Sequence, residues 1–372
     1  MDSITIPAEL KPRDGRFGSG PAKVRPAALA ALGAAHDLMG TSHRQQPVKN
    51  LVASVQEQLS ELYSAPAEYQ VVLGNGGPTL FWELATCSLI EHRAACGVYG
   101  EFSRKFAAGI AAAPFLAPPV LQEVAPGCSI VPVAAPDCDV YAWTQHETST
   151  GACAAVQRPD GIGDALVLLD ATSAAGGMDA KITATDAYYF APQKNLSSDG
   201  GLWIAFCSPA ALERAAQLKA ANNRWIPPML DLTLAAENSA QHQTYNTPAI
   251  ATLFLLDQQL QWILAQGGME FVVARTRRSS SHIYAWAEST PFTTPFVSNP
   301  AVRSPVVCTI DFDPSIDSKL LLKTLRANGI VDVAPYRSLG RNQLRIGVYA
   351  AVEPDDVYAL TACIDYVVER IS

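Results

Sequence analysis

Residues 165–206 read ALVLLDATSAAGGMDAKITATDAYYFAPQKNLSSDGGLWIAF, and this stretch indicates an α/β protein. Its apolar runs, such as 165–169, lack the polar alternation of a half-buried strand, which is typical of strands in a parallel sheet covered by helices on both faces. Shorter β-rich runs at 95–100, 129–134 and 140–148 predict further strands before it. We therefore predict a large α/β domain.

Helical patterns lie on the N-terminal side of these strands. Residues 21–39 are rich in alanine and leucine, and Pro26 suits a first helical turn. Residues 48–65 place apolar side chains on one helical face, namely Leu51, Val55, Leu59 and Leu62. The segment that follows predicts a strand at 69–73, a glycine turn at 74–77 and another helix.

The C-terminal part reads as a separate α+β unit. A helical stretch at 249–266 is broken at Gly267-Gly268 and resumes over 269–289, which suits a bridge between domains. Strands and helices are then predicted at 304–313, 318–329, 330–336, 343–349 and 355–371. We predict an N-terminal arm at 1–16, a large domain at 17–258 and a small domain at 259–372.

Composition sets the broad class of protein. The 372 residues are 49% hydrophobic and 17% charged, as expected of a globular enzyme of two domains. The net charge of −8 argues against nucleic acid or an anionic membrane as a partner. Because no apolar run reaches spanning length and the N-terminus lacks a secretory pattern, we expect a cytoplasmic protein. The eight scattered cysteines form no CxxC pair, so we expect free thiols and no metal site.

Asp170 and Lys194 are the first candidates for chemistry. Asp170 directly follows five apolar residues, at the strand end where α/β sheets place ligands. Lys194 lies in a polar turn between two apolar strands, where its amine would be partly desolvated. Together they suit pyridoxal phosphate, with the amine forming the Schiff base and the carboxylate keeping the pyridine nitrogen protonated. Taken singly, each has a simpler reading as a loop cap or a solvated lysine.

Three further features could complete such a site. The GNGG sequence at 74–77, between strand and helix, could present N–H groups to a phosphate, or be a plain turn. It is not a dinucleotide fingerprint, because Thr79 occupies the last glycine position of GxGxxG. Phe102 could stack on the cofactor ring or pack in the core. Thr148 could bind the phenolic oxygen of the ring or close a turn.

Taken together, these motifs resemble the phosphoserine aminotransferases, a family in the class V branch of fold-type I pyridoxal-phosphate enzymes. The resemblance spans most of the chain, and the strings that carry it are FGSGPA (17–22), GTSHR (40–44), GNGG (74–77), HET (146–148), LLDATS (168–173), APQKN (191–195), YNTP (245–248) and LRIGVY (344–349). It implies a large domain with a mainly parallel seven-stranded sheet and a smaller C-terminal α+β domain.

The resemblance also implies roles for individual residues. Lys194 would form the Schiff base, Asp170 would face the pyridinium, Phe102 would stack and Thr148 would bind the phenolic oxygen. Residues around the cofactor phosphate would be Gly76, Gly77, Thr172 and Gln193, joined across a homodimer by the partner's copies of Asn246 and Thr247. Substrate groups would be bound by His43, Arg44, Arg337 and Arg345, although Arg44 and Arg337 could equally be surface arginines. Guanidinium groups suit a phosphate and a carboxylate because they bind both in a bidentate manner.

Three positions depart from the common form of the family. Thr79 stands where an arginine is usual, Tyr336 where a histidine is usual, and Phe102 where tryptophan is frequent. We expect these changes to affect phosphate recognition and to leave the cofactor chemistry intact.

The implied reaction is reversible transamination of 3-phosphohydroxypyruvate with glutamate, giving phosphoserine and 2-oxoglutarate for serine biosynthesis. Use of 4-phosphohydroxythreonine in pyridoxine biosynthesis stays open. One alternative is an alanine– or serine–glyoxylate aminotransferase, which would need fewer arginines. Another is a non-catalytic pyridoxal-phosphate-binding protein. A cysteine desulfurase is disfavoured because Gln193, and not histidine, precedes Lys194, and a nicotinamide dehydrogenase because the nucleotide fingerprint is missing.

Overall fold

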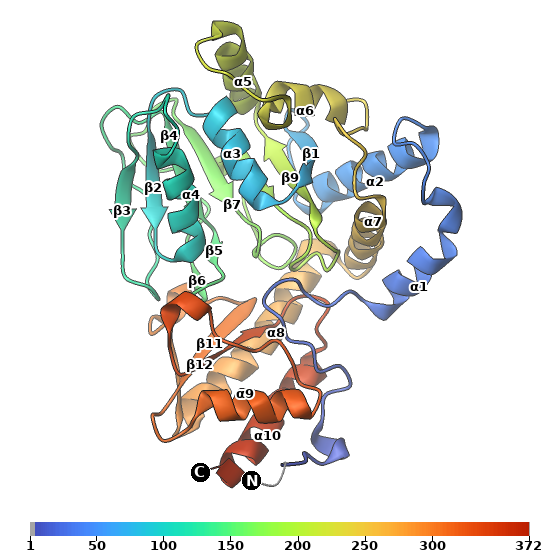
Figure 1. The fold of residues 1–372 in the computed structure, drawn as a ribbon, viewed down its shortest axis with the longest axis vertical. Coiled ribbons are helices and arrows are strands. Elements are labelled where there is room, and N and C mark those ends of the chain that lie inside the picture. The colour runs from blue at the N-terminus through green and yellow to red at the C-terminus, as the bar shows by residue number, and fades with distance from the viewer. Residues whose placement is uncertain (1–3, 372) are drawn as a thin grey trace.

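A seven-stranded sheet forms the centre of the upper lobe in Figure 1. The structure is a computed structural model that describes residues 4–371. Strand β9 is antiparallel to both of its neighbours, and the remaining pairs are parallel, which confirms the predicted sheet. In spatial order the strands are β1 (Gln70–Gly76), β9 (Gly201–Cys207), β8 (Ala187–Phe190), β7 (Leu166–Asp170), β4 (Val140–Thr144), β2 (Ala94–Val98) and β3 (Val120–Glu123).

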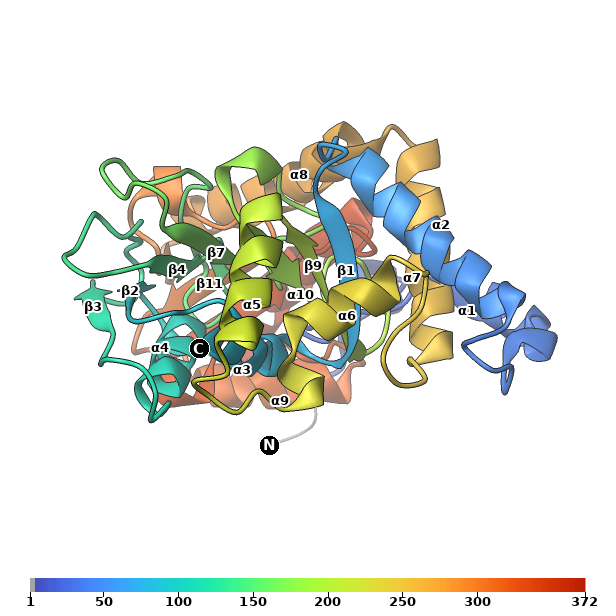
Figure 2. The same ribbon diagram turned by 90° about the horizontal axis from the view of Figure 1, so that it is seen from above.

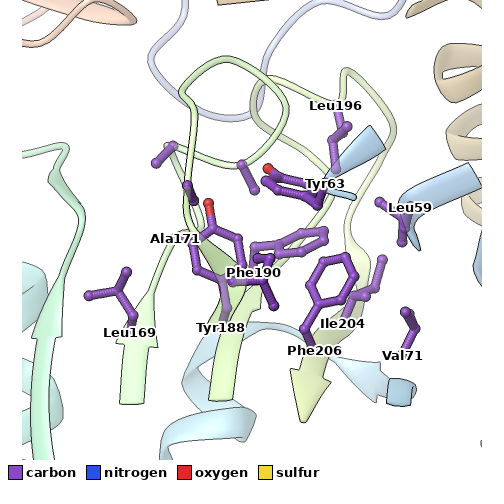
Figure 3. Packing of buried hydrophobic residues seen from close by; sticks show 14 of the residues in the cluster. Leu59, Tyr63, Val71, Leu169, Ala171, Tyr188, Phe190, Leu196, Ile204 and Phe206 are labelled. Carbon is purple, nitrogen blue, oxygen red and sulfur yellow. The ribbon is translucent and has the colours of Figure 1, made fainter. Parts of the chain in front are cut away.

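Both faces of this sheet are buried, because successive side chains point to opposite sides. On one face, aromatic residues of β8 and β9 pack with Tyr63, as Figure 3 shows for Tyr188, Phe190 and Phe206. Helices α2 (Gln46–Leu62) and α7 (Ile250–Ala265) cover this face and lie side by side in Figure 2. On the other face lie α3 (Pro78–Ser88), α4 (Glu101–Ala111), α5 (Pro209–Ala221) and α6 (Leu232–Ser239).

The helices near the N-terminus follow their predicted patterns. The four apolar residues predicted for one face of 48–65, Leu51, Val55, Leu59 and Leu62, are all buried in α2. Helix α1 (Pro26–Ala34) begins at the predicted proline but ends earlier than expected, and a 3-10 turn, η2 (His36–Leu38), follows it.

The glycine turn predicted at 74–77 is wrong for its first three residues. Strand β1 continues through Gly76 and pairs with β9 along its whole length. Gly74 is needed there because a Cβ atom at this position would lie 2.2 Å from the Trp203 ring. Only Gly77 lies outside the strand, and it precedes α3, whose first residue is Pro78. Proline fits this place because the first N–H of a helix has no partner within the helix.

The strand predicted at 129–134 is also wrong, and the edge strand β3 was not predicted. Pro132 lacks an N–H group for a strand ladder. The Gln122 side chain on β3 instead accepts from Val133 N and donates to Val133 O, both at 2.8 Å. At this edge of the sheet the segment around Val133 is therefore bound by the Gln122 side chain and does not form an eighth strand.

The lower lobe contains a three-stranded antiparallel sheet, in the order β10 (Thr293–Pro295), β11 (Val307–Phe312) and β12 (Gln343–Gly347). Its core also draws on α9 (Ser318–Ala327), α10 (Pro354–Ile371) and the second half of α8 (Gly268–Ser289). The first half of α8 packs in the upper lobe through Val272, so this helix joins the two cores. Ile6 and Phe17 show that the N-terminal segment packs on the lower core. The domain boundaries at 16 and 258 stay predictions.

The remaining elements are small. A two-stranded ribbon consists of β5 (His146–Glu147) and β6 (Ala152–Cys153). The predicted segment 330–336 carries a single β-bridge, from Arg16 to Val331. All eight cysteines are unpaired. Between residues 4 and 371 no helix is long and apolar enough to cross a bilayer, and no cluster of acidic, histidine or cysteine side chains could hold a metal ion.

Replacing Gly74 with alanine should displace the Trp203 ring and lower the free energy of unfolding by about 1–3 kcal/mol, as overpacking does elsewhere. Urea unfolding of the apo-protein measures this change. Gly77→Ala is the matched control, because its Cβ would meet no atom within 4 Å. Equal midpoints for the two variants would contradict the account of Gly74.

Candidate active site

A cavity of about 470 Å³ lies at the carboxyl ends of β4 and β7 and at the N-termini of α3 and α4. Carboxyl ends of parallel strands and helix N-termini are where α/β folds place anionic ligands. Six of the predicted residues line it: Phe102, Thr148, Asp170, Thr172, Gln193 and Lys194. Thr79, which stands where the family usually has an arginine, also lines the cavity. Gly76 and Gly77 do not line it, but they directly precede the lining residues Pro78 and Thr79.

Lys194 lies in the loop between β8 and β9, as predicted, and its amine points into the cavity. Its Nζ donates a hydrogen bond to Ser19 O at 2.9 Å and lies 5.9 Å from the centre of the Phe102 ring. Burial, and then the positive charge of Arg345, lower the pKa of this amine to about 8. A larger share of this amine is therefore neutral and nucleophilic near neutral pH than for an ordinary lysine.

The segment at 18–20 is shaped around this lysine. A Cβ atom on Gly20 would lie 2.1 Å from Lys194 Nζ, and Gly20 has a φ of +139°, so only glycine is suited to the position. Ser19 O accepts a second hydrogen bond, from Tyr349 Oη at 2.8 Å. One carbonyl therefore contacts both the upper-lobe lysine and a residue just after β12.

Asp170 ends β7 and is buried, as its position after an apolar run predicted. Its carboxylate accepts from Trp82 Nε1 at 2.9 Å and from Thr172 N at 2.8 Å. Burial raises the pKa of this carboxyl group, although the bonds from Thr172 and Trp82 oppose the shift. Among residues 4–371 no cationic side chain forms an ion pair with Asp170. A cation placed in the cavity would stabilise the carboxylate.

Hydroxyl groups from two neighbouring segments meet beside the lysine. Thr148 Oγ1 donates to Ser173 Oγ at 2.6 Å, and Ser173 Oγ lies 2.7 Å from His146 Nδ1. Burial, and then the charges of Lys194 and Arg345, lower the pKa of His146 to about 3, so the imidazole is neutral. The hydroxyl of Thr148 thus has a fixed position in the cavity.

Glu147 supports the site by binding the start of α4, and this role was not predicted from the sequence. It is fully buried, and its carboxylate accepts from the backbone N–H groups of Phe102 and Ser103 at 3.0–3.2 Å and from Ser149 Oγ at 2.7 Å. A carboxylate at a helix N-terminus is favoured by the free N–H groups and by the helix dipole. Glu147 therefore fixes the first turn of α4, which carries Phe102.

Arg345, on β12, approaches the cavity from the lower lobe. Its Nη1 donates to Thr148 O at 3.2 Å, and its guanidinium lies 5.2 Å from the centre of the Tyr336 ring. Burial lowers the pKa of this guanidinium. The other predicted arginine of this lobe, Arg337, begins the 3-10 turn η6 (Arg337–Leu339) and is exposed.

Four further predicted residues, His43, Arg44, Asn246 and Thr247, also lie outside the cavity lining. Thr247 Oγ1 lies 3.0 Å from His43 Nδ1, and Asn75 donates to Thr247 O at 2.7 Å. Arg44 donates to Gln243 Oε1 at 3.3 Å. Asn246, Thr247 and Arg44 are exposed.

Comparison with known sequences identifies the family. Residues 128–342 match the sequence model of the aminotransferases of class V. The chain belongs to the class-V aminotransferase family. A Nocardioides phosphoserine aminotransferase is 54% identical over 373 residues and covers the full length of both chains. A protein of Mycolicibacterium vanbaalenii, provisionally named a phosphoserine aminotransferase, is 56% identical over 370 residues, again over both full lengths.

Solved structures share the fold. A phosphoserine aminotransferase from Cytophaga hutchinsonii superimposes with a TM-score of 0.86 at 21% identity, over 95% of this chain and 99% of that one. A phosphoserine aminotransferase from Trichomonas vaginalis with bound pyridoxal phosphate gives 0.78 at 20% identity, over 95% and 100% of the two chains. Members of this class-V family are pyridoxal-phosphate enzymes, and the cofactor of this chain is pyridoxal phosphate.

The cavity fits this cofactor. It offers an amine, a buried carboxylate that forms no ion pair within residues 4–371, and an aromatic ring on the first turn of α4. It is bordered by buried polar atoms that have no hydrogen-bond partner within residues 4–371: Thr144 Oγ1, His146 Nε2 and Gln193 Oε1. Such atoms are costly to bury unless a ligand or water pairs with them. The start of α3 at Pro78 and Thr79 supplies the helix N-terminus that suits a phosphate.

The lowered pKa of Lys194 can be measured on the apo-enzyme. Because only the neutral amine attacks a carbonyl group, the rate of reaction with pyridoxal phosphate should rise with pH and level off with a midpoint near 8. Arg345→Gln should move the midpoint to higher pH, since it removes a positive charge that lowers this pKa. Absorbance stopped-flow follows the reaction.

Arg341→Gln is the control for that experiment, because Arg341 pairs with Asp311 and does not line the cavity. It should leave the midpoint unchanged. A midpoint near the value of about 10.4 for a free lysine would refute the claim that burial lowers the pKa of Lys194.

Proposed function

We propose that the protein is a phosphoserine aminotransferase that exchanges the amino group of glutamate with 3-phosphohydroxypyruvate, giving phosphoserine and 2-oxoglutarate. The observation that carries the proposal is the desolvated amine of Lys194 in a cavity shared with the buried carboxylate Asp170 and the hydroxyl of Thr148. The full-length similarity to the Nocardioides phosphoserine aminotransferase supports the choice of substrate.

Lys194 and Asp170 have separate roles in this proposal. When bound, pyridoxal phosphate supplies an electron-accepting ring conjugated to the α-carbon of the substrate. Lys194 would anchor the cofactor, and its Nζ would take the proton from the α-carbon of the substrate. A pKa near 8 suits this exchange, because the amine can both lose and regain a proton near neutral pH. Asp170 would keep the ring nitrogen of the cofactor protonated, and its carboxylate is held in position by Trp82 and Thr172 N.

The remaining cofactor contacts are proposed from their place in the cavity. Phe102 covers the ring, and its backbone is held by Glu147. Thr148 binds the phenolic oxygen, while Gly76, Gly77, Thr172 and Gln193 surround the phosphate. The unpaired Oε1 atom of Gln193 is consistent with a ligand contact at that side chain.

Substrate binding is assigned to both lobes. Arg345 binds the carboxylate, because its guanidinium is half-buried with no carboxylate partner within residues 4–371. Arg337, on the exposed turn η6, is proposed to bind the substrate phosphate. Asn246 and Thr247 are proposed to complete the cofactor site of the partner in a homodimer, and His43 and Arg44 to bind the substrate phosphate. None of the four lines this cavity, and Thr247 lies against His43.

We place the reaction in the cytoplasm, because the eight unpaired cysteines suit a reducing compartment. No role for nucleic acid or a membrane is proposed. Use of 4-phosphohydroxythreonine in pyridoxine biosynthesis is a second candidate reaction for the same site.

Substrate preference tests the proposal directly. The holoenzyme should transaminate phosphoserine with 2-oxoglutarate at a kcat/KM at least about 100-fold above that for serine, because arginines built for a phosphate are left unpaired by the unphosphorylated analogue. Lys194→Ala should abolish turnover, whereas Lys181→Ala, an exposed lysine outside the cavity, should not change it. A preference for serine or alanine with glyoxylate would favour the alternative class-V activity.

The shared site can be tested by mixing inactive subunits. Lys194→Ala and the double variant Asn246→Ala, Thr247→Ala should each be impaired, and an exchanged 1:1 mixture should regain about a quarter of wild-type activity. Half of the dimers are then hybrids, and each hybrid has one intact site of two. A mixture no more active than its parents, with exchange verified by native mass spectrometry, would contradict a site built from two chains.

A further inference from the structure

Tyr336 lies between the two lobes, where it contacts Phe102, a residue that lines the catalytic cavity. Its ring meets the Phe102 ring edge-on, with centroids 5.8 Å apart and planes inclined by 67°. Such edge-to-face contacts stabilise the arrangement beyond simple burial. Tyr336 precedes η6, so a residue of the C-terminal part contacts the ring predicted to cover the cofactor.

The same ring contacts the guanidinium of Arg345. The centre of the guanidinium is 5.2 Å from the ring centroid, within the range of a cation–π interaction. Apart from this ring, the side chain of Arg345 has one hydrogen bond to the described residues, to Thr148 O, and its buried Nε has no partner. The Tyr336 ring is thus one of two contacts that set the position of this guanidinium.

Two polar contacts hold the loop in place. Lys105 Nζ donates to Tyr336 Oη at 3.4 Å, and Ser338 Oγ donates to Glu101 Oε2 at 3.2 Å. Both partners belong to the first turns of α4, and Lys105 and Glu101 also pair with each other at 3.3 Å. Exposed pairs of this kind contribute little energy, so the ring contacts carry most of the positioning.

We propose that Tyr336 is a positioning residue for the substrate carboxylate: its ring spans Phe102 and Arg345 and so fixes the guanidinium relative to the cofactor ring. The proposal rests on the proposed function, which assigns a carboxylate to Arg345. Every amino and keto acid substrate of a transaminase carries that carboxylate. Loss of the ring should therefore weaken the binding of phosphorylated and unphosphorylated substrates alike.

This consequence separates the proposal from a role in phosphate binding. Tyr336 is adjacent to Arg337, and a side chain that served only the phosphate would affect phosphoserine and leave glutamate unchanged. Glutamate and phosphoserine can be compared in single half-reactions with the holoenzyme, followed by the absorbance of the cofactor. Glutarate, a dicarboxylate without an amino group, supplies a third probe, because calorimetry measures its binding to the apo-enzyme without any turnover.

Tyr336→Ala should weaken the apparent affinity for glutamate and phosphoserine by a similar factor, about 3- to 30-fold, and glutarate binding should fall in parallel. Tyr336→Phe is the conservative control: it keeps both ring contacts, loses only the bond from Lys105, and should stay within about twofold of the wild type. The maximal half-reaction rates should change less than the affinities.

Three outcomes overturn the proposal: an effect on phosphoserine alone, unchanged affinities in Tyr336→Ala, or a loss in Tyr336→Phe as large as in Tyr336→Ala. The unfolding midpoint of apo Tyr336→Ala, expected within about 2 °C of the wild type for a partly exposed side chain, excludes a general loss of structure. Failure of the wild type to convert phosphoserine would refute the proposed function instead, and the glutarate measurement does not depend on that activity.

Discussion

The site depends on removing one amine from water without giving it a strong counter-charge. Lys194 is held by a neutral carbonyl, and the two carboxylates whose charges act on it, Asp170 and Glu147, accept hydrogen bonds from neutral donors. Burial can then lower the pKa of the amine, since no ion pair within residues 4–371 opposes the shift. A salt bridge to Lys194 would stabilise the empty protein but keep the amine protonated. The fold therefore keeps a charged group poorly compensated where chemistry requires it.

The sequence predicted those parts of the fold and site that depend on local pattern. Asp170 and Lys194 were found because apolar strands end beside them, and α2 because its apolar residues recur at helical spacing. Trp82, Glu147 and Ser19 could not be found this way, because their partners lie 88, 44 and 175 residues away in the chain. The prediction of a turn at Gly74 was wrong for the same reason. Glycine is required at this position because of the Trp203 ring, which belongs to a strand distant in sequence.

Hydrophobic packing on the two faces of the large sheet offsets the energetic cost of the unpaired polar groups in the site. Unpaired polar atoms such as Thr144 Oγ1 and Gln193 Oε1 destabilise the protein by an amount comparable to lost hydrogen bonds. Aromatic and aliphatic packing on both faces of the seven-stranded sheet offsets that cost. Binding of the cofactor to the folded chain should add stability that grows with the logarithm of the ratio between its concentration and its Kd. The rigid sheet also explains why residues from distant strands keep a common geometry.

The carbonyl of Ser19 has a consequence for motion. It accepts from Lys194 in one lobe and from Tyr349, which follows β12, in the other, while Phe17 O accepts from Gly347 N at 2.8 Å. The short strip 17–19 is therefore tethered to the lower lobe and touches the reactive amine. A hinge rotation that moved β12 would also move the Ser19 carbonyl. Lys194 would then gain or lose its hydrogen bond to that carbonyl. A change in the angle between the lobes would therefore also alter the hydrogen bond that holds the Lys194 amine.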